Sequence, residues 1–196
     1  MHGADLLEHF GTGEPELWRD WAASLRRSFG AFWISDAEGS YPAIALDAAK
    51  RPVDTVTSNL GHLLGTGILT ANEASSVAVR LVGPRLSSGF GLRTLSTDSA
   101  GYWPLSYHGG SVWAHDTAIA IAGLAREGFA VEAAELSEGL LSAAASFDYR
   151  LPELHSGEAA SAFPRAVPYP AACRPQAWSA AAAISVLASS LGLTPG

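Results

Sequence analysis

The sequence is poor in several residue types, and each scarcity excludes a class of function. Cysteine occurs once in 196 residues, at Cys173, so neither an intrachain disulfide nor a multi-cysteine zinc site can form. Lysine and arginine total 12 against 19 acidic residues, which gives a formal net charge of -7. This balance argues against binding to nucleic acid or to an anionic membrane, and it favours a neutral ligand over a phosphorylated one.

Long hydrophobic runs are also missing. The longest apolar stretch lies near 180–188, is interrupted by Ser185 and is too short to span a bilayer. The first thirty residues carry several acids and lack the basic end and apolar core of a signal peptide. Gly109-Gly110 alone is a weak signal for a phosphate loop. We therefore expect a cytoplasmic protein without membrane contact and without a cofactor.

What the sequence does contain is typical of one globular domain covering residues 1–196. Hydrophobic residues make up 48% of the chain and charged residues 16%, a composition that excludes extensive disorder. A chain of this length buries a substantial core.

Hydrophobic periodicity predicts six helices of two kinds, separated by long loops. Three are amphipathic, at 14–31, 71–83 and 129–147, and three are rich in small apolar residues, at 55–66, 116–127 and 175–191. Asp54 or Thr55 is the expected N-cap of the second helix, and Pro175 the expected first residue of the last. Alternation of the two kinds is how a helical toroid is built. The predicted fold is therefore all-α, with six helices forming about half of a twelve-helix toroid.

Two irregular segments interrupt this helical pattern. A turn signal, Asp36-Ala-Glu-Gly39, predicts a short hairpin or irregular loop between 32 and 47. Residues 148–174 read as a long loop, and loops of this length inside a compact domain are usually functional or disordered. Its aromatic, proline and arginine residues favour an ordered loop.

The stretch 102–116 concentrates aromatic residues, two histidines and an acid immediately before a predicted helix. Sugar-binding clefts need flat aromatic faces beside hydrogen-bonding groups, because a pyranose has an apolar face and a rim of hydroxyls. A buried aromatic loop that only fills the core is the alternative interpretation. The candidate sugar-contacting residues are Trp103, Tyr107, His108, Trp113, His115 and Asp116.

Glu153 is the candidate catalytic carboxylate. Pro152 precedes it, and Leu151 and Leu154 flank the pair, which favours the partial burial that a general base needs. Solvent exposure remains the alternative for a glutamate on a loop.

Asp116 admits two interpretations. It either caps the helix that follows or clamps two sugar hydroxyls, since a carboxylate accepts hydrogen bonds in a fixed geometry. His108 and His115 lie seven residues apart without a third histidine at a supporting spacing, so we expect no metal site.

Several stretches resemble the bacterial amylo-α-1,6-glucosidase (glycogen debranching) family. Tyr107-His-Gly-Gly-Ser-Val-Trp-Ala-His-Asp-Thr117 is similar to that family's Tyr-His-Asn-Gly-Ser-Val-Trp-Pro-His-Asp-Thr motif. Further similar stretches occur at 41–47, 50–54, 57–64, 150–154 and 167–178. The resemblance covers nearly the whole chain from about residue 30.

The resemblance implies an (α/α)6 barrel and an inverting glycosidase that acts on an α-glucan. In such enzymes one acid protonates the leaving oxygen while a second carboxylate, typically about 6.5–9.5 Å away, activates water. By resemblance Glu153 is the general base, and Trp113, His115 and Asp116 line the sugar cleft.

The chain departs from the family at Gly109, where the motif has Asn, and at Ala114, where it has Pro. It corresponds only to the C-terminal part of longer family members, and we expect the general acid to come from outside it. The expected partners are therefore an upstream polypeptide or a second copy that completes the barrel.

Three functions remain open at this point. The chain is the C-terminal half of a glycoside hydrolase, a non-catalytic α-glucan-binding module, or a structural oligomer of half-barrels. Turnover, binding without turnover, and dimerisation independent of sugar distinguish the three.

Overall fold

The computed structural model describes residues 2–193, and within them the chain forms six α-helices, two short 3-10 helices and three two-stranded sheets. The α-helices are α1 (His2–His9), α2 (Pro15–Ser28), α3 (Ala71–Val82), α4 (Ala114–Arg126), α5 (Ala130–Ala145) and α6 (Ala177–Ser190). The 3-10 helices are η1 (Phe29–Phe32) and η2 (Ser58–Leu63). The strands are β1 (Trp33–Asp36), β2 (Gly39–Pro42), β3 (Ala45–Leu46), β4 (Pro52–Val53), β5 (Val112–Trp113) and β6 (Leu154–His155).

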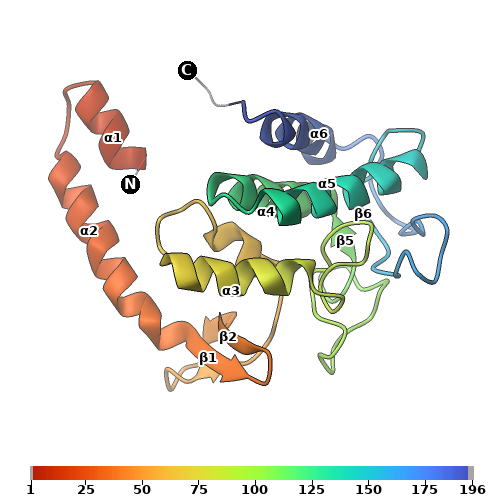
Figure 1. Cartoon of the computed structure of the whole chain (residues 1–196), viewed down its shortest axis with the longest axis horizontal. Coiled ribbons are helices and arrows are strands. Elements are labelled where there is room, and N and C mark those ends of the chain that lie inside the picture. Colours follow the sequence, from red (N-terminus) through yellow and green to blue (C-terminus); the bar gives the residue numbers. More distant parts are fainter. Residues whose placement is uncertain (1, 194–196) are drawn as a thin grey trace.

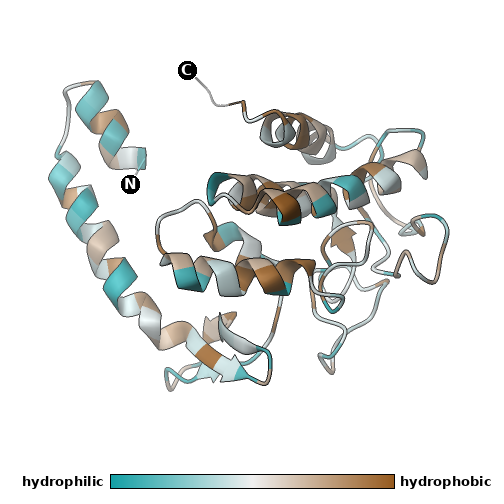
Figure 2. Cartoon of the chain, viewed as in Figure 1, coloured by the Kyte–Doolittle hydropathy of each residue, from teal (hydrophilic) through white to brown (hydrophobic). Residues whose placement is uncertain are grey.

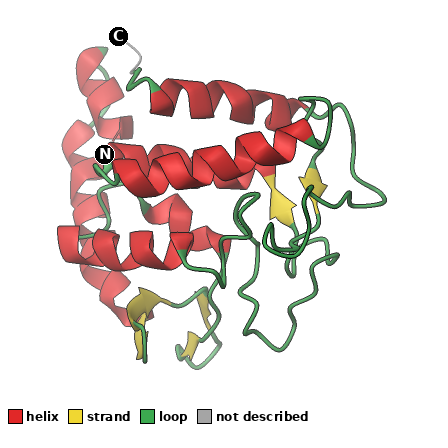
Figure 3. Cartoon of the chain, turned by 45° about the vertical axis from the view of Figure 1, so that its right-hand side comes forward, coloured by secondary structure: helices red, strands yellow, loops and turns green. Residues whose placement is uncertain are grey.

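Helix α4 lies at the centre of the fold. It packs against α6, α5 and η2, while α3 packs against η2 and α5, so the helices form layers (Figures 1 and 3). The largest fully buried side chains include Leu81, Ile121, Leu124, Leu136 and Leu140, which α3, α4 and α5 contribute. The small-residue pattern of α4 therefore marks a helix buried on several sides.

Glycines set the closeness of η2 to α4. A Cβ added to Gly61 would lie 2.5 Å from the Cβ of Ala120, and one added to Gly123 would lie 2.7 Å from the Cβ of Leu64. No side chain fits at either position without displacing its neighbour. These two glycines are thus required by packing.

The helix predicted over 55–66 is wrong in type and extent. Only the 3-10 helix η2 forms there, and its N-cap is Thr57, which makes no side-chain cap bond. The expected cap Asp54 instead accepts a hydrogen bond of 2.5 Å from the hydroxyl of Tyr41. The segment contains Gly61 and ends next to Gly65, residues that disfavour an α-helix.

The other helices begin or end a few residues away from their predicted boundaries. α3 begins at Ala71 behind a Thr70–Glu73 capping box. α4 begins at Ala114, before the predicted 116, and α6 at Ala177 after the cap Gln176 rather than at Pro175. The amphipathic helix expected at 14–31 ends at Ser28 and continues as η1.

The all-α prediction is too simple, because short antiparallel strands connect the helices. β1 pairs with β2 around the turn that the sequence signalled, and β3 pairs with β4. β5 pairs with β6, so the region read as an irregular loop over 148–174 contains a strand. The fold is mixed but largely helical.

The helices α1 and α2 form an N-terminal arm (residues 2–28) that stands apart from the helical layers (Figure 1). α2 has no buried residue, although its sequence has one apolar face. Figure 2 shows hydrophobic positions along this arm and along α6. The predicted amphipathic pattern is present, but the structure does not cover its apolar face.

No helix in the range 2–193 combines the length and the hydropathy needed to cross a membrane.

Candidate active site

A cleft of about 640 Å³ opens where the N-terminal ends of η2, α4 and α6 converge. A helix has the positive end of its dipole at its N-terminus. The cleft is lined by Ile44, Thr55, Thr57, Ser58, Asn59, Thr94, Leu95, Tyr107, His108, Trp113, His115, Asp116, Glu153 and Trp178. Glu153 and five of the six predicted sugar-contacting residues therefore share one hollow.

Glu153 is brought to the cleft by strand pairing. β6 begins at the next residue, Leu154, which pairs with Trp113 on β5. The backbone N–H of Glu153 donates to the carbonyl of Cys173 at 2.9 Å. Glu153 thus lies immediately before β6, is tied to the return loop through Cys173, and is half-buried rather than fully exposed.

The hydroxyl of Tyr107 orients the carboxylate. It donates a hydrogen bond of 2.7 Å to Glu153 Oε1, and this bond holds the pKa of Tyr107 above its ordinary value. The tyrosine therefore stays protonated as a donor, and the other carboxylate oxygen of Glu153 makes no side-chain hydrogen bond with the described residues. A free oxygen on an oriented carboxylate is what activation of a water molecule needs.

Aromatic rings form one wall of the cleft. The rings of His108 and Trp113 stack with centroids 5.2 Å apart and planes 11° apart, and Tyr107 meets Trp113 edge-on at 4.7 Å. The indole N–H of Trp113 donates to the carbonyl of Tyr107 at 2.8 Å, which fixes the indole plane. Such rings provide a rigid apolar surface beside polar groups.

In the turn that carries this wall, a side chain at Gly109 would displace the Ser106 hydroxyl. A Cβ there would lie 2.7 Å from Ser106 Oγ, and that hydroxyl already accepts the Gly109 N–H at 3.1 Å. The departure from the debranching-family motif at this position is therefore accommodated by Ser106.

Asp116 does not cap α4, because the N-cap is Trp113 and Asp116 stands in the first turn. Its Oδ1 lies 2.5 Å from His62 Nε2, and this bond raises the pKa of His62. Its Oδ2 and the Nδ1 of His115 are buried without a partner among the described residues. Burial lowers the pKa of His115, which favours its neutral form.

Asp116 Oδ2 and His115 Nδ1 belong to consecutive residues and differ in hydrogen-bonding capacity. Asp116 Oδ2 can accept a hydrogen bond from a hydroxyl, and a neutral imidazole nitrogen can either donate or accept one. Protein encloses both atoms, and leaving them without a partner costs stability.

Trp103 is placed differently from the other predicted residues. It is 62% exposed and is not among the residues lining the cleft, although its turn is tied to Gly109 through a backbone bond. A role in sugar contact for Trp103 stays a prediction.

Two site residues were not singled out from the sequence. Trp178 lines the cleft and lies 4.4 Å, centroid to centroid, from the ring of His115. His62 reaches Asp116 from η2, 54 positions away in sequence. Both residues lie in stretches that resemble the debranching family, 167–178 and 57–64, but nothing in the local sequence marked His62 as a partner of Asp116.

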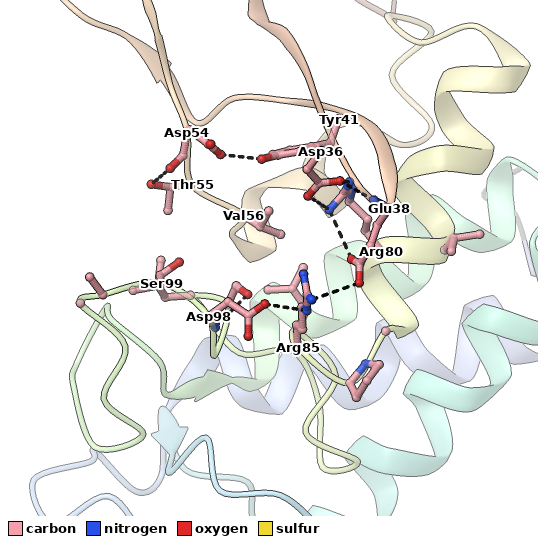
Figure 4. A pocket seen from close by; sticks show the side chains of 18 residues that line it. Asp36, Glu38, Tyr41, Asp54, Thr55, Val56, Arg80, Arg85, Asp98 and Ser99 are labelled. Carbon is pink, nitrogen blue, oxygen red and sulfur yellow. Dashed lines mark hydrogen bonds and ion pairs between the residues drawn. The ribbon is translucent and has the colours of Figure 1, made fainter.

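A larger hollow of about 1050 Å³ lies on the other side of the segment 55–57, between the β1–β2 hairpin and the loop after α3 (Figure 4). Arg80 pairs with Asp36, and Arg85 bridges Glu38 and Asp98. Because these charges pair with one another and Arg80 covers the ring of Tyr41 at 4.0 Å, the hollow offers no aromatic platform. We place the candidate active site in the smaller cleft.

The family model of the mannosylglycerate hydrolase MGH1-like glycoside hydrolase domain matches residues 4–159, which is most of the chain and includes Glu153. The chain belongs to this family. None of the curated proteins matches the sequence with significance.

Two solved structures from Thermus thermophilus share the fold, each with a TM-score of 0.63. One is an uncharacterized conserved protein, 19% identical, for which the match covers 96% of this chain and 42% of the other. The second is a GH63 mannosylglycerate hydrolase in complex with Tris, 20% identical, with 93% and 41% covered. The chain thus spans less than half the length of these relatives.

These findings place the chain among glycoside hydrolases. They support the glycosidase part of the resemblance and do not single out the amylo-α-1,6-glucosidase branch.

Proposed function

We propose that this chain forms the half of an inverting glycoside hydrolase site that carries the general base Glu153. The proposal rests on one observation above all: Glu153 stands in an aromatic-walled cleft with one oxygen fixed by the Tyr107 hydroxyl. In this mechanism the free oxygen of Glu153 removes a proton from water as the water attacks the anomeric carbon. Trp113, His115 and Asp116 hold the sugar.

The general acid of this mechanism has to come from residues outside this chain. The second carboxylate of the cleft, Asp116, is bound to His62 and serves sugar hydroxyls in our proposal. The likeness to solved chains more than twice as long supports this division of the site. We infer an α-linked glucan as substrate from the debranching-type motif 107–117, with a mannoside as the alternative that the name of the Thermus enzyme suggests.

A substrate whose leaving group needs no proton tests the base without the acid. α-Glucosyl fluoride releases fluoride as a stable anion, so a site with only the base and the sugar contacts can hydrolyse it. We expect the chain to release fluoride and β-glucose, and Glu153→Gln to lower the rate about 10²- to 10⁴-fold. A branched limit dextrin, which needs the acid, should be cut far more slowly. α-Mannosyl fluoride in a parallel assay identifies the sugar.

Equal fluoride release by the wild type and by Glu153→Gln would contradict the proposed base. Calorimetric titration with maltooligosaccharides measures binding, and it tests the second candidate function, a non-catalytic glucan-binding module. Binding without any fluoride release would favour that candidate.

A further inference from the structure

The helices α2 and α6 lie at the margins of the fold, and each exposes an apolar face to solvent. On α2, the side chains of Leu17, Trp18, Trp21 and Leu25 are all exposed and follow one face of the helix. The charged residues of the same helix lie on its opposite face, as the 100° rotation per residue requires. An isolated helix of this length is marginal in water, so packing has to stabilise the arm.

Helix α6 exposes the second face. Its fourteen residues include no charged side chain, and only Ser179, Ala182 and Val186 are buried. Ile184, Leu187 and Leu191 are exposed at spacings of three and four, which places them on one stripe away from the buried side. A helix of this composition is typical of an element covered on most sides.

The accessible surface area of the chain is larger than that expected for a folded monomer of the same mass. The chain exposes 10932 Å². A folded monomer of its mass, 20.3 kDa, is expected to expose about 8,800 Å². The excess of about 2,100 Å² per chain exceeds the roughly 800 Å² per partner of a standard interface and falls in the range of obligate homodimers.

We propose that a second copy of this chain supplies the cover, with the α2 face of each copy packed on the α6 stripe of the other. α2 and α6 are both 14 residues long, about 21 Å each, so the two stripes match in length. A reciprocal pair of this kind is the closed two-fold arrangement that most soluble homodimers adopt.

Sedimentation of the wild type and three single variants tests the contact. We expect a dimer at micromolar concentration, and monomers for Trp21→Glu and for Leu187→Arg, because each places a charge in an apolar interface. Both wild-type side chains are more than half exposed within the chain, so neither change disturbs the core. Val131→Glu on α5, which replaces a 77% exposed side chain outside both stripes, is the matched control and should remain dimeric.

Mixing the two monomeric variants gives the decisive result. A mixed pair keeps one unchanged α2–α6 contact and places the introduced acid opposite the introduced base in the other, so heterodimers should form. A wild type that stays monomeric would overturn the proposal and assign the two faces to helices of another polypeptide. A dimer that only one variant breaks, or that neither breaks, would likewise overturn it, since the contact would then be α2–α2, α6–α6 or elsewhere.

Discussion

Lowering the pH should destabilise this protein through His155, which lies in strand β6, two residues after Glu153. The imidazole is 1% exposed, and its Nδ1 donates to the carbonyl of Ser156 at 2.9 Å. Because Nδ1 carries the proton, Nε2 is the basic nitrogen, and it is buried without a partner among the described residues. Protonation would therefore place a charge in the core, and burial lowers the pKa of His155 to about 4 against the smaller opposing effect of backbone groups at Ser156 and Phe90.

The sign of the effect follows from linkage. The folded pKa lies below the unfolded value of 6.5, so the unfolded chain binds more protons between these limits and stability falls as the pH falls. A shift from 6.5 to about 4 corresponds to roughly 3 kcal/mol in total. About 2 kcal/mol of this should disappear between pH 7 and pH 5.

Urea unfolding of the wild type and of His155→Asn at pH 7, 6 and 5 measures this contribution. The asparagine amide can still donate to the Ser156 carbonyl, but it cannot titrate. Every other ionisable group is common to both proteins, so the difference between their pH slopes isolates His155. Equal slopes would refute the argument, even if the variant is less stable at every pH.

Two further predictions concern η2. Asp116 raises the pKa of His62, so the pair stabilises the fold below pH 6.5 and loses this effect as the pH rises through the folded pKa. NMR titration should find a lower His62 pKa in Asp116→Asn than in the wild type. An unchanged pKa would contradict the pairing. Gly61→Ala would put a Cβ 2.5 Å from Ala120 and should cost about 1–3 kcal/mol in urea unfolding. Gly30→Ala, which meets nothing within 4 Å, is its control, and equal losses would contradict the packing argument.

The sequence predicts most of the helices because their apolar positions repeat with helical spacing. The helices expected at 71–83 and 129–147 agree with α3 and α5 within two residues at each end. Prediction fails at 55–66, where Gly61 serves contact with α4 and the chain forms a 3-10 helix. It also fails for β5 and β6, since a ladder of two residues per strand is too short for alternation to reveal.

The sequence predicts which residues belong to the candidate site, but only in part how they come together in space. Aromatic density and the flanking leucines indicate Tyr107, Trp113 and Glu153 individually. Their meeting depends on the pairing of β5 with β6, about forty residues apart, and no local pattern encodes that contact. The bond from His62 to Asp116 could not be predicted either, because the two residues are 54 positions apart in the sequence.

The unequal lengths of the connections explain why the cleft lies at one end of the helices. η2 leads to α3 through residues 64–70, and α4 leads to α5 through residues 127–129. The return connections, 83–113 and 146–176, are far longer and gather at the opposite end, where loops dominate Figure 3. The short turns have too few residues to form a binding site. The long return connections can place Glu153 and the aromatic wall against the helix N-termini. Substitutions in the short turns should therefore affect stability, and substitutions of cleft-lining residues in the long connections, such as Tyr107 and Glu153, should affect sugar binding and turnover.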